Sequence, residues 1–288
     1  MSPEHPTRYG PVLDPRPLFP RERTALLALL GALDPADWSR PTVCPGWDVH
    51  DVVAHLLNDY LRRLSGSRDG HPGAVFANDE TLPSYVNRTN GEFVTAARQL
   101  SPRVLTELLG HLGPQLDALW AAQRLDAPAA LSVSWAAPPG EDVPAWLDIA
   151  REYTEHWVHQ QQIRDAVGRP GADCPDLLGP VVDAFLRGLP YALRDRGGPD
   201  GTSVRFDVTG PAGGTWTAVR SAGRWALATG AAADRAAARD TARVAMDQDV
   251  LWRLATRGIT PEEARRRSEL SGDAGLTEAA TSLLAIVA

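Results

Sequence analysis

Cysteine is scarce in this sequence, and its scarcity excludes whole classes of protein. The chain has 288 residues but only two cysteines, Cys44 and Cys174. Two cysteines cannot form the disulfide framework of a small secreted domain, and neither belongs to a C-x-x-C pair of the kind that binds zinc or performs redox chemistry. Disulfide-stabilised and C-x-x-C zinc or redox folds are therefore excluded.

Long apolar runs and an excess of basic charge are also missing. No apolar run approaches the length needed to span a bilayer. The formal net charge is -7, which removes the overall basic footprint of a nucleic-acid-binding protein. The first residues, MSPEHPTRYGPVLDPRP, are polar and lack the apolar core of a secretory signal, so we expect a cytoplasmic protein. The basic residues are arginine rather than lysine, and alanine, glycine and proline are abundant, as in a high-GC actinobacterial genome.

The length exceeds that of most single cores, so we expect two domains, residues 1–172 and 173–288. The first domain is predicted to be an up-down bundle of four or five helices. Leucines recur at helical spacing over residues 21–34, and a well-capped amphipathic helix is expected to follow Asp48. Further helices are expected from about Ser84 to Leu100, from Ser101 onward with a possible break at Gly113-Pro114, and from about 144 to 167. The segment 65–84, rich in glycine, serine and proline, is predicted to be a loop.

The second domain has a different pattern of apolar and polar residues. A helix is expected from about Leu177 to Arg196. The run GTSVRFDVTGPAGGTWTAVRSAGRWALATG then alternates apolar and polar residues between glycine-rich turns, which predicts a meander of strands. ARVAMD is a candidate fourth strand, and DVLWRLATRG and PEEARRRSEL are predicted to be short helices. The domain should therefore be of the α+β class.

Two acid–histidine pairs with helical spacing stand out in the last helix of the first domain. Glu155 and His159 are four residues apart, and so are Glu152 and His156. On a helix such a pair lies on one face, where both side chains can bind one divalent ion or can form an ordinary surface ion pair. Since all four side chains fall within a narrow arc of the helix, spacing does not choose between the two pairs.

A tight metal site needs a third ligand, and His55 is the best candidate. It lies inside VVAHLL, at the edge of the apolar stripe of the helix that follows Asp48, so it should face the interior of the bundle. On a neighbouring helix it could meet one acid–histidine pair. The alternative is that all three side chains only make hydrogen bonds in the core.

The order of two motifs resembles a known family. CPGWDVHDVVAHL, followed far downstream by EHWVHQQQIRDAVGRP, is similar to the mycothiol-dependent maleylpyruvate isomerase family, within the DinB-like metal-binding bundles. The resemblance implies a DinB-like four-helix bundle with a smaller sterol-carrier-like α+β domain after it. It also selects the ligands: His55, eight residues after Trp47, and Glu155 with His159, counted back from Gly168.

The resemblance further implies a divalent metal, most simply zinc, and mycothiol as the thiol cofactor. A metal with three protein ligands keeps an open position, where an arriving thiol would lose its proton. A thiolate can add to a double bond conjugated to a carbonyl, allow rotation, and leave, so that a cis alkene becomes trans. Many relatives have an aspartate three residues after the second histidine, where this chain has Gln162, which puts its substrate in question.

Candidate substrate-binding residues are arginines, because a small dianionic substrate needs bidentate cations. We expect Arg88 from the bundle, and Arg220 and Arg253 from the second domain, to act in catalysis, with Arg224 as a further candidate. Cys44, just before the capped helix, could instead be a nucleophile, although a structural cysteine is the simpler interpretation.

The sequence thus favours a metal-dependent and mycothiol-dependent isomerase or thiol transferase, acting as a monomer on a small unsaturated carbonyl or carboxylate compound, with no nucleic-acid or membrane partner. One alternative is an enzyme of the same fold that modifies a natural product without a thiol. Another is a non-catalytic protein that encloses an apolar ligand between its domains.

Overall fold

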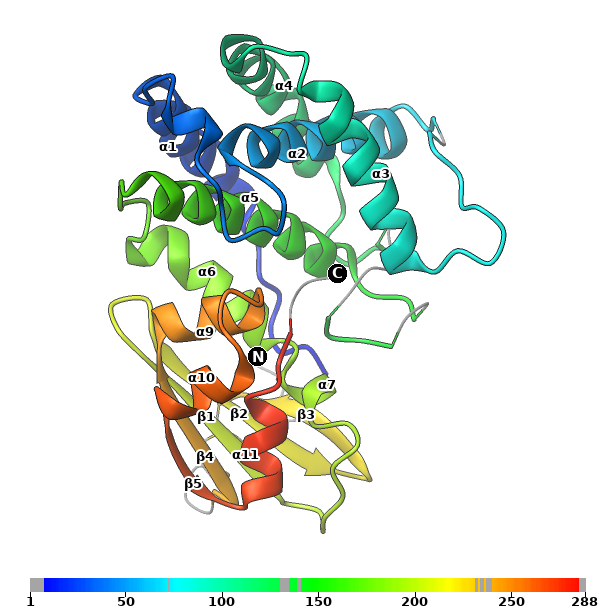
Figure 1. Cartoon of the computed structure of the whole chain (residues 1–288). Helices are drawn as coiled ribbons and strands as arrows, with labels where there is room; N and C mark the ends of the chain where they lie inside the picture. Colours follow the sequence, from blue (N-terminus) through cyan, green and yellow to red (C-terminus); the bar gives the residue numbers. More distant parts are fainter. Residues whose placement is uncertain are drawn as a thin grey trace.

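The structure, a computed structural model, describes residues 8–71, 73–129, 135–138, 141–230, 233, 236 and 240–284. It has a helical first half and a second half built on one sheet (Figure 1). The predicted fold class, a helical N-terminal region followed by an α+β region, is confirmed. No helix among the described residues is long and apolar enough to cross a membrane.

Five long helices form the first half: α1 (Phe19–Gly31), α2 (Val49–Arg62), α3 (Leu82–Ala97), α4 (Pro102–Ala122) and α5 (Ala145–Val167). Local side chains define where several of them begin. Asp48 accepts a hydrogen bond from the backbone N–H of Asp51, and Ser101 caps α4 in the same way. Gly168 ends α5 in the left-handed conformation that glycine adopts without strain.

Helix α2 shows how the apolar pattern positions the site. Its face made of Val52, Val53, Leu56 and Leu57 is fully buried in the bundle. Burial of that face fixes the rotation of the helix about its axis. The neighbouring stripe, which carries His55, is thereby turned toward a cavity and toward α5.

Two segments differ from expectation in the first half. The chain after α2 does not become a loop at once but continues as a wide π-helical turn, Arg63–Arg68. Helix α4 is continuous through Pro114. Gly113 there lies against the Arg23 side chain, which occupies the space where a Cβ would be. Tertiary packing of α1 on α4 thus keeps intact a helix that local propensity would break.

The second half contains a five-stranded sheet in the order β3-β2-β1-β4-β5. Its strands are β1 (Ser203–Thr209), β2 (Gly214–Ser221), β3 (Arg224–Ala228), β4 (Ala242–Asp247) and β5 (Glu269–Gly272). The predicted meander is β1 to β3, paired antiparallel, and ARVAMD is β4, which pairs parallel to β1. Short helices α9 (Gln248–Ala255), α10 (Pro261–Arg266) and α11 (Ala274–Ala280) complete this half.

Two predictions about this half were wrong. PEEARRRSEL is not one helix: α10 ends at Arg266, and the residues after it form the edge strand β5 against β4. Pairing with the open edge of β4 supplies backbone hydrogen bonds that a short helix could not provide. The helix expected over 177–196 is divided into α6 (Pro175–Leu186) and α7 (Leu189–Ala192), with Gly188 between them.

Helix α6 packs on α5 and on α9, so it joins the two halves. Across this junction Trp157 and Trp252 meet edge to face with ring centroids 5.6 Å apart, and Arg253 binds Asp165 at 2.6 Å. The domain boundary expected at residue 172 falls in the connection between α5 and α6. Because α6 packs on both halves, that boundary stays a prediction.

An acid buried in the bundle core is the least expected feature of α1. Glu22 is fully buried, and its Oε1 accepts a hydrogen bond of 2.6 Å from Gln160 Nε2. Its Oε2 has no hydrogen-bond partner among the described residues. Burial raises the pKa of Glu22 above its ordinary value, despite the opposing charges of His156 and nearby arginines.

Replacing Glu22 with Gln should stabilise the protein, and increasingly so at higher pH. The folded state holds the Glu22 proton more tightly than the unfolded state, so wild-type stability falls as pH rises from the ordinary carboxyl pKa toward the raised one. The amide introduced by Glu22→Gln keeps an oxygen acceptor for Gln160 and has no charge to bury. The gain should approach about 1.4 kcal/mol for each unit by which the pKa is raised.

The measurement is the melting temperature of wild type and Glu22→Gln across the pH range from acidic to neutral. Glu107→Gln, at an exposed position of α4, is the matched control and should follow wild type at every pH. Parallel curves for wild type and Glu22→Gln would contradict the prediction.

Candidate metal centre

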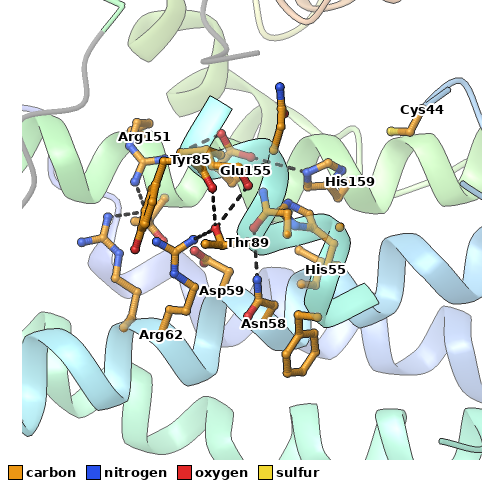
Figure 2. A pocket seen from close by; sticks show the side chains of 18 of the residues that line it. Cys44, His55, Asn58, Asp59, Arg62, Tyr85, Thr89, Arg151, Glu155 and His159 are labelled. Carbon is orange, nitrogen blue, oxygen red and sulfur yellow. Dashed lines mark hydrogen bonds and ion pairs between the residues drawn. The ribbon is translucent and has the colours of Figure 1, made fainter. Parts of the chain in front are cut away.

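A cavity of about 1330 Å³ lies between α2, α3 and α5 and extends to residues of the second half. Its walls include one end lined by His55, Glu155 and His159 and another lined by Arg62, Tyr85 and Thr89 (Figure 2). The first end gathers the residues that the sequence predicts as metal ligands.

The structure brings His55, Glu155 and His159 together. One nitrogen or oxygen atom from each lies within 4.8 Å of the others. His159 Nε2 is 3.4 Å from Glu155 Oε2, and the His55 and His159 rings meet edge to face with centroids 4.7 Å apart. His55 comes from α2 and the other two from α5, so the packing of these two helices forms the cluster.

Gln162 orients one of the histidines. Its Oε1 lies 2.7 Å from His159 Nδ1 and also accepts from Cys44 Sγ at 3.1 Å. An amide oxygen only accepts, so His159 donates from Nδ1 and directs Nε2 toward Glu155 and His55. A carbonyl acceptor behind a histidine is the usual partner that fixes a metal ligand. Gln162 therefore supplies a neutral acceptor behind His159.

The two histidines of the cluster differ in protonation. Burial, with the charge of His159 beside it, lowers the pKa of His55 to about 3, so its imidazole is neutral and able to coordinate. Its Nδ1 is buried without a hydrogen-bond partner among the described residues. Burial by itself would lower the pKa of His159, but the neighbouring Cys44 and Glu155 outweigh it and raise the pKa to about 10. A cation bound here would displace that proton.

Two imidazoles and one carboxylate fit zinc and several other divalent metals. His55 Nδ1 lacks a partner among the described residues, and Glu155 lies beside both histidines, so the three side chains offer a donor set for one ion. Three protein ligands at the wall of an open cavity would leave a coordination position for a small molecule, as catalytic sites do.

The second acid–histidine pair, Glu152 and His156, forms ion pairs with neighbouring side chains. Asp59, Glu152 and His156 also lie within 4.8 Å of one another. However, Glu152 forms ion pairs with both Arg63 and Arg151, and Asp59 Oδ2 is 3.2 Å from His156 Nε2. Burial lowers the pKa of His156, but Asp59 more than offsets this and raises it. Arginine and histidine charges thus balance these acids, which leaves the Glu155 and His159 pair for an ion.

The arginines predicted to bind substrate lie elsewhere. Arg88 binds Glu80 at 2.8 Å and the carbonyl oxygen of Val75 at 3.1 Å. Arg220 binds the carbonyl oxygen of Gly198 at 2.6 Å, and Arg253 pairs with Asp165 and Asp249. None of the three is among the residues that line the cavity, and Arg224 is not among them either. Their catalytic role stays a prediction.

Sequence reasoning missed Arg257, which does line the cavity. It follows α9, is exposed, and has a φ of +60°. Among the described residues no carboxylate lies within ion-pair distance of it. The signal in the sequence was the pair Arg257-Gly258 just past a helix, a place where the chain often turns through the left-handed region.

Replacing Gln162 with Leu should weaken zinc binding about 10- to 100-fold, because His159 loses the acceptor that orients it. Gln162→Glu should restore most of the affinity, since a carboxylate also accepts from Nδ1. Competition with a chromophoric chelator measures the affinity. Gln161→Leu is the control: Gln161 binds the carbonyl oxygen of Gly171 and not a ligand, so this variant should match wild type. Equal losses in the two leucine variants would show a general packing effect.

Comparison with known proteins relates the helical half of the chain to a known family. Residues 19–164 match the family model of the mycothiol maleylpyruvate isomerase N-terminal domain. Uncharacterized proteins of two Mycobacterium tuberculosis strains, CDC 1551 / Oshkosh and H37Rv, are each 27% identical over 206 residues, covering 68% of this chain and 73% of theirs.

Two crystal structures of mycothiol-dependent maleylpyruvate isomerase are similar in fold. The one with a histidine-to-alanine mutation has a TM-score of 0.54 and 14% identity, and covers 93% of this chain and 96% of its own. The other has a TM-score of 0.53 and 15% identity, with coverages of 88% and 93%. At such identity the similarity establishes the fold alone. The family model spans the helices that build the cluster, and this chain belongs to the mycothiol maleylpyruvate isomerase N-terminal domain family.

Proposed function

We propose that this protein is a divalent-metal-dependent enzyme that uses mycothiol, as an isomerase or thiol transferase acting on a small unsaturated carbonyl or carboxylate compound. The observation that carries the proposal is the cluster of His55, Glu155 and His159 at the wall of a large open cavity. Family membership and the fold shared with mycothiol-dependent maleylpyruvate isomerase support the choice of thiol and reaction class.

Each residue has a defined part in this proposal. His55, Glu155 and His159 would hold the ion, zinc being the simplest choice for this donor set. The bound ion would supply positive charge that favours thiolate over thiol at neutral pH. Gln162 keeps His159 in the tautomer that presents Nε2, and Cys44 donates to the same amide oxygen. Cys44 therefore serves the histidine ligand rather than acting as a nucleophile.

Arg257 is a cavity arginine that can bind the carboxylate of a small substrate. Arg63 and Arg151, which also line the cavity, are already neutralised by Asp148 and Glu152. Among the described residues Arg257 has no such partner, so its guanidinium can form a bidentate pair with an incoming carboxylate. It comes from the second half of the chain, and the proposed active site therefore needs both halves.

The cavity itself favours an enzyme over a protein that only encloses an apolar ligand. A binding protein would need an apolar chamber separate from His55, whereas this cavity, although its lining is largely apolar, contains His55 together with Glu155 and His159. The amide of Gln162 leaves the identity of the substrate open. A reaction on maleylpyruvate is the first to assay, and a thiol-independent step on another compound is the alternative outcome.

The first test is metal content by plasma mass spectrometry on protein purified without a histidine tag. We expect about one zinc per chain after reconstitution, falling at least 10-fold in His55→Ala, because loss of one of three ligands removes most of the affinity. The loaded enzyme should isomerise maleylpyruvate only when mycothiol is present. Absence of metal even after reconstitution would overturn the proposal, and activity without the thiol would select the alternative.

Replacing Arg257 with Gln should raise the KM for a carboxylate substrate about 10- to 100-fold, because a charge-assisted hydrogen bond contributes about 1.5–3 kcal/mol. Zinc affinity should not change. Arg266→Gln, at an exposed position of α10 where Arg266 pairs with Glu263, is the control and should have a normal KM. An unchanged KM in Arg257→Gln would contradict the role proposed for Arg257.

A further inference from the structure

The end of the cavity away from the metal ligands contains a second cation without a carboxylate partner among the described residues. We propose that Arg62, with Thr89 and Tyr85, is an anion-binding subsite for a ligand whose other end reaches the ion at His55, Glu155 and His159. The anion is an oxyanion, most simply a carboxylate. This inference rests on the proposed metal site for the position of the ligand's other end.

The contacts of Arg62 distinguish it from its neighbours. Its Nη1 donates to Thr89 Oγ1 at 3.3 Å, and its guanidinium carbon lies 5.6 Å from the centroid of the Tyr85 ring. Both partners are neutral, and no carboxylate of the described chain lies within ion-pair distance. The next residue, Arg63, is by contrast buried against Asp148 and Glu152.

The partners of Arg62 are themselves held in place. Thr89 Oγ1 donates to the carbonyl oxygen of Tyr85 at 2.9 Å, so it can accept from Arg62. The Tyr85 hydroxyl donates to the carbonyl oxygen of Ala74 at 2.8 Å, and its ring stacks on Phe76 with centroids 4.1 Å apart. A fixed ring on one side and a fixed hydroxyl on the other orient the guanidinium and leave its remaining N–H groups free for an anion.

Helix geometry gives the distance between the two ends. Arg62 and His55 are seven residues apart on α2, about 10 Å along its axis. Figure 2 shows both on this helix, with Asn58 and Asp59 between them. A ligand bound at both ends must therefore be elongated.

The wall between the two ends sets the character of the ligand's middle. Asn58 Nδ2 donates to Asn90 Oδ1 at 3.1 Å, which leaves each amide further donors or acceptors toward the cavity. Asp59 is paired with His156. The wall between the two ends thus presents amides beside apolar side chains such as Leu56 and Val158, which suits a chain that carries a few polar groups.

The test uses linear dicarboxylates of increasing length, from succinate to sebacate, titrated into zinc-loaded protein by calorimetry. In wild type the affinity should rise to a maximum at the length that spans about 10 Å. Arg62→Gln should weaken binding of the longest acids about 10- to 100-fold and leave acetate unaffected, because only the far carboxylate loses its partner. Arg62→Lys should keep part of the affinity.

Arg103→Gln, at an exposed position of α4, is the control and should match wild type. Circular dichroism and zinc affinity should be unchanged in Arg62→Gln, which rules out a folding defect. Equal binding of all acids by wild type and Arg62→Gln would overturn the subsite. If Arg62→Gln weakens the long acids while His55→Ala and removal of zinc have no effect, the subsite stands and the proposed metal function fails.

Discussion

The antiparallel register of α2 and α5 is the constraint on which the site depends. Three levels of contact fix it. Arg63, at the end of α2, binds Asp148 and Glu152; one turn earlier Asp59 meets His156; one turn earlier again His55 meets Glu155 and His159. Sliding either helix by one turn would separate all three sets at once. Buried ion pairs add little net stability, but an unpaired buried charge is costly, so such a network selects one register strongly.

That register also explains why two similar acid–histidine pairs behave differently. The pair nearer the arginines, Glu152 and His156, is neutralised by Arg63, Arg151 and Asp59. The pair one turn further along faces His55, whose Nδ1 has no partner in the described structure. Arg151 reaches Glu155 only at 3.7 Å. The charges of Glu152 and His156 are balanced by neighbouring side chains, so this pair forms a structural cluster. Beside Glu155 and His159, His55 Nδ1 lacks a partner among the described residues, so the second pair forms a candidate metal centre.

The second half of the chain completes the cavity rather than standing apart from it. The Trp157–Trp252 contact and the Arg253–Asp165 pair hold α9 against α5. This docking carries the end of α9, with Arg257, to the cavity. Arg253 and Arg257 are four residues apart, yet one serves the junction and the other faces the cavity, because the helix ends between them and the backbone turns to a positive φ.

By itself the sequence determined the long helices of the first half, several of their caps and the faces that carry candidate ligands, because these depend on residues a few positions apart. Periodicity placed His55 beside a buried stripe and placed Glu155 and His159 on one face of α5. Spacing could not choose between the two acid–histidine pairs; family resemblance chose one, and the structure shows a difference that spacing could not, the pairing of Glu152 with Arg63 from another helix. The edge strand β5 was missed for a similar reason, since its hydrogen bonds come from β4. Only the tertiary structure decided which arginines pair with a carboxylate and which remain free to bind a ligand. The reason is that the fold determines which acidic side chains lie within reach of each long arginine side chain.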